Sequence, residues 1–372
     1  AMTLGLSFNY IGSGTLILED TAAFYQSDDE MINTGVVEVK RKTTPILKTD
    51  YTYWSSPVSN QQLLAVSPDS SPDKFYSFGA NAANWIQETV TNTMDSGKGY
   101  IIRGPESFSE TVPAIYESVF KGVPNNGIVS TPIGTTGTSN LIGNPYSSAI
   151  DADLFLAANS SVIKGTVYLW THNTAFANNV YTSNDYAVYN LLGGVGTSSA
   201  VNSGINNAKP NGKIASGQAF FVKGINGGGN AVFNNSMRIV GQNASFFKSN
   251  GIQNTKALAA IEKHRIWLNL SNNQGAFKQI LIGYATGASS NEDDLLDAKS
   301  FNGNVFLDFY SLNQETKLVI QARALPFEET DEVLLGYKAA IEGIFSINID
   351  EVDGVLKNQS VFIEDKQMNI IH

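Results

Sequence analysis

The chain has 372 residues, no cysteine, and 24 basic against 34 acidic side chains, which gives a formal charge of −10. This length predicts about two to three domains at roughly 100–200 residues each. The acidic excess argues against a nucleic-acid binder, and no apolar run approaches the roughly 18–20 residues that span a bilayer. Without cysteine there are no disulfides, no thiolate catalysis and no cysteine-ligated zinc. We therefore expect neither nucleic acid nor membrane insertion.

Short predicted strands fill the N-terminal segment. They cover 14–18, 23–26 and 35–40, and the gaps between them carry the Gly, Asn or Asp that tight turns require. Strands of this length suit the edge of a β-solenoid or a β-sandwich. The sequence therefore predicts a short β-solenoid-like cap or stub at residues 1–44.

An internal repeat organises the middle of the chain. Its clearest element is a Ser-Gly turn that leads into an aromatic and aliphatic strand ending in a basic residue and glycine. The pattern predicts two repeated β domains of the sandwich or jelly-roll type, at 45–137 and 138–243. Each has one short helical turn, the first starting near Ser59 and Asn60 and the second capped by Asp151. Three pairs of stretches match in order: 53–58 with 141–146, 74–78 with 166–170, and 94–104 with 214–224.

The second copy is longer than the first because it contains a polar insertion at 171–212, rich in Asn, Gly, Ser and Thr. A long insertion on a rigid scaffold is a place where binding residues concentrate, although a tolerated surface loop is the simpler interpretation. Aromatic rings stack on sugar faces, and neighbouring amides and carboxylates can hydrogen-bond to sugar hydroxyls. The candidate ligand-binding residues are therefore Trp170, His172, Tyr181, Asn184, Asp185 and Tyr186.

The last third of the chain has a different pattern. Residues 244–262 show weak periodicity and are expected to form a linker. From residue 263 onward, stretches of alternating polar and apolar residues predict strands. About seven strands are expected between 263 and 372, a number typical of an immunoglobulin-like β-sandwich. The whole chain is therefore expected to be all-β.

An acidic stretch follows the second of these strands. Asn291, Glu292, Asp293, Asp294 and Asp297 offer hard oxygen ligands, and Ca²⁺ binds about six to eight of them. The stretch lacks the glycine-centred spacing of an EF-hand, so a solvated acidic loop is the competing interpretation. Ca²⁺ is the one cofactor that the sequence suggests.

Motifs of known enzyme classes are missing from the sequence. The three histidines, His172, His264 and His372, form no zinc-binding His-Glu-x-x-His pattern. The sequence contains no Gly-x-Ser-x-Gly elbow and no phosphate-binding Gly-x-x-x-x-Gly-Lys. Carboxylates such as Asp151 with Asp153 or Asp185 could serve a hydrolase only if they face each other about 5–9.5 Å apart. We therefore expect that the protein is not an enzyme.

Several distinctive motifs give the chain a family resemblance. They include Asn140-Leu141-Ile142-Gly143-Asn144-Pro145-Tyr146 and the stretches 53–57, 263–270, 275–279 and 321–327. The chain resembles the large secreted surface proteins of gliding, flavobacterial-type Bacteroidetes, which the type IX secretion system exports. In such proteins a segment like 361–366 leads into a C-terminal sorting domain, and on this comparison the chain ends at His372 without that domain.

The resemblance implies a cellular location, an export partner and a modification site. It places the protein outside the outer membrane, secreted or at the cell surface, with the type IX secretion machinery as a partner during export. It also implies a modification site, because Asp20-Thr21-Ala22 matches the Asp-Ser/Thr-aliphatic pattern that carries O-linked glycans in Bacteroidetes. Thr21 is therefore a candidate glycosylation site.

Together these features predict a non-enzymatic adhesin or stalk module at the cell surface, with glycans or other surface proteins as partners. Two alternatives remain open at this point. One is a carbohydrate-binding accessory region of a larger secreted polysaccharide-degrading enzyme, which requires an aromatic-lined cleft. The other is a purely structural spacer without a ligand.

Overall fold

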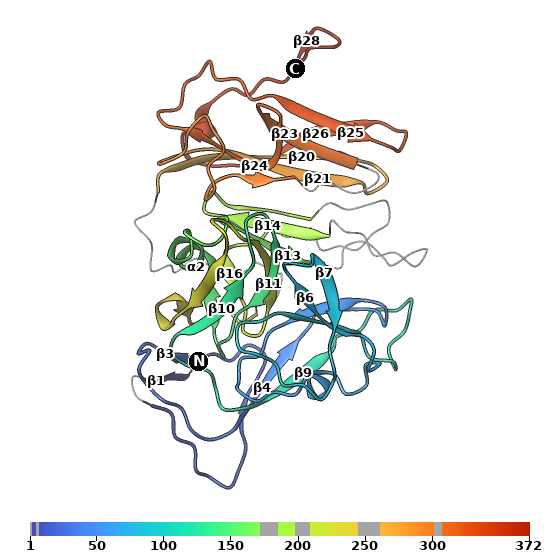
Figure 1. Ribbon diagram of the computed structural model, residues 1–372. Coiled ribbons are helices and arrows are strands. Elements are labelled where there is room, and N and C mark those ends of the chain that lie inside the picture. Colours follow the sequence, from blue (N-terminus) through green and yellow to red (C-terminus); the bar gives the residue numbers. More distant parts are fainter. Residues whose placement is uncertain (1, 5–6, 172–184, 198–208, 245–260, 301–306) are drawn as a thin grey trace.

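The computed structural model of the chain is built mainly from β-strands, which confirms the predicted all-β class. It describes residues 2–4, 7–171, 185–197, 209–244, 261–300 and 307–372. Figure 1 shows the C-terminal sheet at one end, the second repeat in the middle and the N-terminal segment at the other end. Within the described residues, no helix is long and apolar enough to cross a membrane.

The N-terminal segment contains two parallel strand pairs. In the first pair, β1 (Met2–Leu4) lies beside β3 (Phe24–Gln26). In the second, β2 (Leu16–Leu18) lies beside β4 (Val37–Lys42). The sheet does not end there, because β9 (Glu117–Gly122) pairs antiparallel with β4. The segment predicted as a cap at 1–44 therefore shares a sheet with a strand from the region predicted as the first repeat.

The two predicted repeats form sheets with the same strand order. In each sheet the first matched stretch lies at one edge, the third lies next to it, and the second follows. The first sheet contains β5 (Tyr51–Trp54), β8 (Tyr100–Arg103), β6 (Phe75–Gly79) and β7 (Asn84–Gln87), in that spatial order. The second contains β11 (Ser139–Gly143), β17 (Ala219–Lys223), β13 (Thr166–Trp170), β14 (Tyr186–Asn190) and β15 (Gly194–Val195).

The insertion predicted at 171–212 is not loop throughout. Residues Tyr186–Asn190 form β14, which pairs on one side with β13 and on the other with β15, and four of its five residues are buried. A pattern-based comparison with the shorter first copy missed this strand, because the matched motifs lie on either side of it.

Short elements pack with the second repeat, and one of them, β10 (Val129–Ile133), comes from the region predicted as the first repeat. The strand pair β10 and β18 (Gly229–Phe233) shares a hydrophobic core with a three-stranded sheet. That sheet contains β16 (Lys213–Ile214), β12 (Ala149–Asp151) and β19 (Arg238–Ile239), and the 3₁₀ helix η1 (Asn235–Met237) directly precedes β19.

Both predicted helical turns are present. Helix α2 (Ala152–Ala158) begins after Asp151, whose carboxylate accepts the Asp153 N–H at 2.9 Å, as a capping residue should. Helix α1 (Leu63–Val66) starts three residues later than the predicted cap at Asn60, and its N-cap residue Gln62 makes no capping hydrogen bond from its side chain.

The C-terminal region forms one seven-stranded sheet and a separate two-stranded hairpin. The pairing in the seven-stranded sheet is mixed, because β21 and β24 run parallel while the other pairs are antiparallel. In spatial order it contains β25 (Leu335–Ala339), β23 (Leu307–Asn313), β24 (Thr316–Ala324), β21 (Phe277–Ala285), β20 (Lys263–Asn272) and β26 (Phe345–Val352), and β22 (Ala298–Lys299) pairs with β24. The 3₁₀ helix η2 (Gly354–Asn358) and the hairpin of β27 (Glu364–Asp365) and β28 (Ile370–Ile371) follow.

One hydrophobic core runs through both repeats and the C-terminal sheet. It includes Tyr53 from the first repeat, Trp170 and Val188 from the second, and Trp267 and Leu281 from the C-terminal sheet. Burial of apolar surface favours association by roughly 25 cal/mol per Å², so a shared core holds neighbouring sheets together. Of the linker predicted at 244–262, residues 245–260 lie outside the described ranges.

Candidate functional site

Aromatic side chains from both repeats pack together at an interface that we call the repeat joint. It is defined by Tyr53, Trp85, Trp170, Tyr186 and Phe221. The rings of Tyr53 and Trp170 stack, with centroids 5.5 Å apart and an angle of 7° between their planes. The Tyr53 and Tyr186 hydroxyls lie 2.8 Å apart, within hydrogen-bond distance. Trp85 and Phe221 contact this group edge-on. The aromatic residues therefore join the two repeats.

The matched Ser-Gly turns hold the repeat joint from both sides. The Ser55 N–H donates to the Gly217 carbonyl at 2.8 Å, and the Gly143 N–H donates to the Gly97 carbonyl at 2.9 Å. These two bonds are equivalent, because Ser55 matches Gly143 and Gly97 matches Gly217 in the sequence repeat. Each repeat therefore bonds to the other through the same pair of positions.

Of the six ligand-binding residues predicted from the sequence, three lie within the described part of the structure. Trp170 is 7% exposed and lies in the repeat joint beside Tyr186. Asp185 is buried, and its carbonyl accepts hydrogen bonds from the Thr171 N–H and hydroxyl, both at 3.0 Å. The remaining three, His172, Tyr181 and Asn184, lie outside the described residues. The structure therefore brings Trp170 and Tyr186 together, and their rings pack against Tyr53.

The predicted calcium ligands lie in residues 291–297, here called the acidic loop, which contacts the second repeat. Glu292 forms ion pairs with Lys164 and Lys299, both at 2.9 Å, and Asp294 pairs with Lys164 at 2.9 Å. Asp293 accepts hydrogen bonds from the Ser289 N–H and hydroxyl. Among the described residues, no group of three or more His, Asp or Glu is arranged to hold a metal ion. In the structure these carboxylates contact the Lys164 and Lys299 ammonium groups and the Ser289 N–H and hydroxyl.

The backbone of the acidic loop also binds the second repeat. The Gly165 N–H donates to the Asp294 carbonyl at 2.8 Å, and the Leu191 N–H donates to the Leu295 carbonyl at 3.2 Å. Asn291 is exposed, and its N–H donates to the Ser289 hydroxyl at 3.1 Å. The loop thus fastens the C-terminal sheet to the repeat that contains Lys164.

Asp297 is the buried carboxylate of this loop, and we expect it to make stability depend on pH. Its oxygens accept the Ala322 and Asp293 N–H groups, but burial outweighs these bonds and raises the pKa of Asp297 to about 6. Because this folded-state pKa lies above the usual 3.8, the folded protein retains the proton that the unfolded chain has lost. The free energy of unfolding should therefore fall by about 2–3 kcal/mol as pH rises from about 4 to above 6.

Chemical denaturation across this pH range, with Asp297→Asn, measures this contribution. The variant should show a flatter dependence than the wild type, whereas Asp294→Asn, at a side chain that is 51% exposed, should keep the wild-type slope. Equal slopes for the wild type and Asp297→Asn would contradict the assignment.

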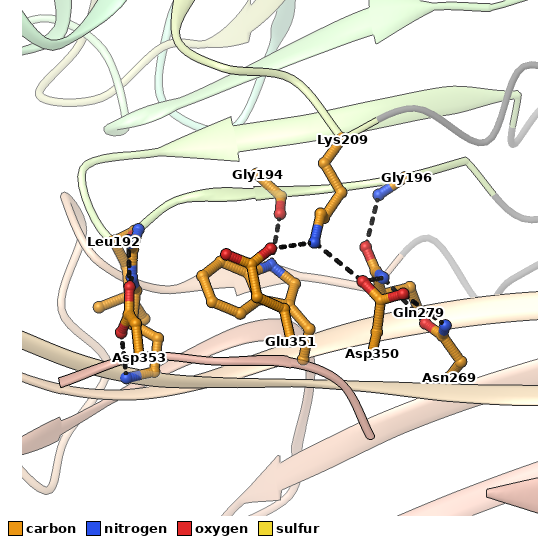
Figure 2. A network of polar contacts seen from close by, with 11 residues as sticks. Leu192, Gly194, Gly196, Lys209, Asn269, Gln279, Asp350, Glu351 and Asp353 are labelled. Atoms are coloured by element: carbon orange, nitrogen blue, oxygen red, sulfur yellow. Dashed lines mark hydrogen bonds and ion pairs between the residues drawn. The ribbon is translucent and has the colours of Figure 1, made fainter. Parts of the chain in front are cut away.

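The most extensive polar contact is the C-terminal joint, formed by residues 191–196 and Lys209 of the second repeat with the C-terminal sheet (Figure 2). Trp267 lies at its centre, 4% exposed, and its indole N–H donates to the Gly194 carbonyl at 2.8 Å. The cationic groups of Lys209 and Arg265 each lie 4.8 Å from the centroid of the Trp267 ring. Cations at this distance from a ring are attracted to its π-electrons.

Ion pairs surround this tryptophan. Lys209 contacts Asp350 at 2.8 Å and Glu351 at 2.5 Å, and Arg265 contacts Asp353 at 2.5 Å. The same Arg265 guanidinium donates to the Leu192 carbonyl at 2.8 Å, so it links the two parts directly.

An amide side chain completes the C-terminal joint. Gln279 accepts the Gly196 N–H at 3.1 Å and donates to Asn269 at 2.8 Å and to Asp350 at 3.1 Å (Figure 2). The contact therefore combines apolar burial, charge and directional hydrogen bonds, which fixes one relative orientation of the two parts.

Two buried arginines bind the N-terminal segment to the second repeat. The sequence patterns did not single them out. Arg41, 1% exposed, donates to the Ser216 carbonyl at 3.0 Å and to the Asn243 carbonyl at 2.6 Å, and it pairs with Asp20 at 2.8 Å. Arg238, 3% exposed, donates to the Phe24 carbonyl at 2.5 Å. Burial lowers the pKa of each guanidinium to about 10.

The predicted glycosylation site lies in a turn of the N-terminal segment. Thr21 is exposed, while Asp20 before it pairs with Arg41 and accepts the Lys42 N–H at 2.8 Å. An exposed hydroxyl on a fixed turn is accessible for modification, which is compatible with the candidate assignment.

One family profile, described as a domain of unknown function (DUF8693), matches residues 3–372. The chain belongs to the DUF8693 family. The match covers the N-terminal segment, both repeats and the C-terminal sheet, so the family unit contains every joint described above. No curated protein and no solved structure matches the chain.

Proposed function

We propose that the chain is a non-enzymatic structural module of a secreted or cell-surface protein, with its parts joined as one stalk-like unit. The observation that carries this proposal is the location of the predicted ligand residues. Trp170 and Tyr186 lie in the repeat joint, and the acidic loop binds the second repeat through Lys164. Side chains engaged in this way support structural contacts between domains rather than capture of a ligand.

The proposed cellular location is supported by sequence features. The resemblance to exported surface proteins of gliding Bacteroidetes supports a location outside the outer membrane, with the type IX secretion machinery as the export partner. The formal charge of −10 supports solubility in an extracellular setting, because like-charged surfaces repel one another.

Two measurements on native material and on purified protein test this function. Protease treatment of intact source cells should release peptides of this chain, as surface exposure requires. The purified protein should unfold in one calorimetric transition and bind no sugar on a glycan array. Strictly intracellular peptides, or separate transitions for the repeats and the C-terminal sheet, would overturn the proposal.

A glycan-binding adhesin is the second candidate, and one observation favours it. Trp85 on β7 is only partly buried, although it contacts Tyr53 and Phe221 of the repeat joint. An aromatic ring at the border of such a cluster can stack on a sugar. In this case the array should show binding that Trp85→Ala abolishes, whereas Ile86→Ala, at the adjacent residue with 49% exposure, should leave binding unchanged.

A further inference from the structure

The last strand of the C-terminal sheet has an open edge. Strand β26 has eight residues and pairs on one side with β20, and it ends the spatial order of the sheet. Within the described part of the chain, no backbone hydrogen bond joins residues 345–349 to any element other than β20. This edge therefore presents unpaired N–H and C=O groups that can bind another strand.

Three other edge strands of the molecule, β7, β15 and β25, have features that discourage such pairing. Strand β7 has only four residues and β15 only two. Strand β25, at the opposite edge of the C-terminal sheet, carries Lys338 near its centre. Short length and charged residues are the usual protection of edges. Strand β26 carries Asp350 and Glu351 at its end, where both pair with Lys209 of the same chain, and its residues 345–349 contain no charge and no proline.

The sequence of β26 is complementary to itself. Residues 345–349 read Phe-Ser-Ile-Asn-Ile, so apolar and polar side chains alternate symmetrically about Ile347. Antiparallel pairing of two such strands about Ile347 places Phe345 opposite Ile349, and Ser346 opposite Asn348. Both apolar and polar faces are then continued across the contact, which a two-fold symmetric interface requires.

The charges fit the same arrangement. In this register Asp350 lies opposite Ile344 and Glu351 opposite Gly343, so no acidic residue faces its own copy. Both carboxylates also pair with Lys209 of their own chain. Repulsion between like charges, which destabilises directly opposed pairs, is therefore avoided.

We propose that β26 pairs antiparallel with β26 of a second copy of the chain, with the two-fold axis at Ile347. The two seven-stranded sheets then form one continuous sheet. Ile349, which is 51% exposed, and Ile344, which is 88% exposed, are covered in the dimer. Half-buried Phe345 and Ile347 already pack on the apolar core of this sheet, and the dimer extends that core.

Sedimentation and light scattering of the full chain over a concentration series test the proposal. The wild type should dimerise, and Ile349→Lys should weaken the dimer at least tenfold because it places a charge in the contact. The matched control is Ile86→Lys, at a residue of similar exposure on edge strand β7, and it should dimerise as the wild type does. A monomeric wild type, or a dimer that Ile349→Lys leaves intact, overturns the proposal.

A single cysteine provides an independent readout, since the chain has none of its own. Directly opposed residues in antiparallel strands have Cα atoms about 4.5–5.5 Å apart, within the range of a disulfide. Ile347→Cys should therefore form a disulfide-linked dimer under mild oxidation, whereas Ile86→Cys should not. If the wild type is a dimer but Ile347→Cys does not crosslink, the proposed pairing is wrong. This result does not depend on whether Ile349→Lys folds.

Discussion

Replacing Trp267 with alanine is expected to lower the free energy of unfolding by about 3–5 kcal/mol, the usual cost of truncating a large buried aromatic residue. The variant leaves a cavity in the core shared by the second repeat and the C-terminal sheet. It also removes the hydrogen-bond donor to the Gly194 carbonyl and the ring over which Lys209 and Arg265 lie. Urea denaturation followed by circular dichroism measures the change.

Tyr337→Ala is the matched control for this experiment. Tyr337 belongs to the same sheet but is 64% exposed, so its truncation should change stability by less than about 0.5 kcal/mol. Calorimetry adds a second expectation: Trp267→Ala should separate unfolding of the C-terminal sheet from that of the repeats. A single transition with wild-type stability would show that the C-terminal joint contributes little.

Much of the architecture was predictable from local sequence patterns. The Ser-Gly turns before 98–104 and 218–224 revealed the repeat, and the structure gives the matched strands the same order in both sheets. Asp151 revealed α2 because a capping carboxylate at the start of a helix is a local signal. Alternation from residue 263 onward predicted strands, and the C-terminal sheet contains β20 starting at Lys263. Such signals depend only on residues close in sequence.

The site could not be predicted to the same extent, because its contacts join residues far apart in sequence. Trp170 and Tyr186 are both predicted ligand-binding residues, but the sequence does not show that Tyr53, more than one hundred residues earlier, packs on both. The acidic loop is predicted as a calcium site, and the sequence cannot show that Lys164 lies beside it. The type of each residue was informative, but its partner depended on the tertiary fold.

The joints also explain why these residue types occur where they do. In the stalk proposed above, the parts must not rotate against one another under force, and aromatic stacking, ion pairs and backbone hydrogen bonds restrict rotation in different directions. The repeat joint relies mainly on stacked rings, and the C-terminal joint relies mainly on charged and amide groups around Trp267. The family match from residue 3 to residue 372 is consistent with one unit that needs all of these contacts.

The second large effect is expected at Arg41, where Arg41→Met should cost about 3–5 kcal/mol of stability, the range for removing one partner of a buried charged contact. The variant leaves the Ser216 and Asn243 carbonyls and the Asp20 carboxylate without this guanidinium. Because the pKa of Arg41, lowered by burial to about 10, remains well above neutral pH, the lost group is a charged one. Urea denaturation measures the loss, and limited proteolysis should show faster cleavage within residues 1–44.

Lys42 provides the control, because it is the next residue of the same strand. Its side chain is 49% exposed and pairs with Glu117 at 3.3 Å, so Lys42→Met should cost no more than about 1 kcal/mol. Arg41→Lys distinguishes charge from geometry, since a lysine ammonium cannot reproduce the planar set of donors that reaches Ser216 and Asn243 together. Arg41→Lys should therefore be nearly as destabilised as Arg41→Met. Wild-type stability in the lysine variant would show that the charge alone holds the N-terminal segment to the second repeat.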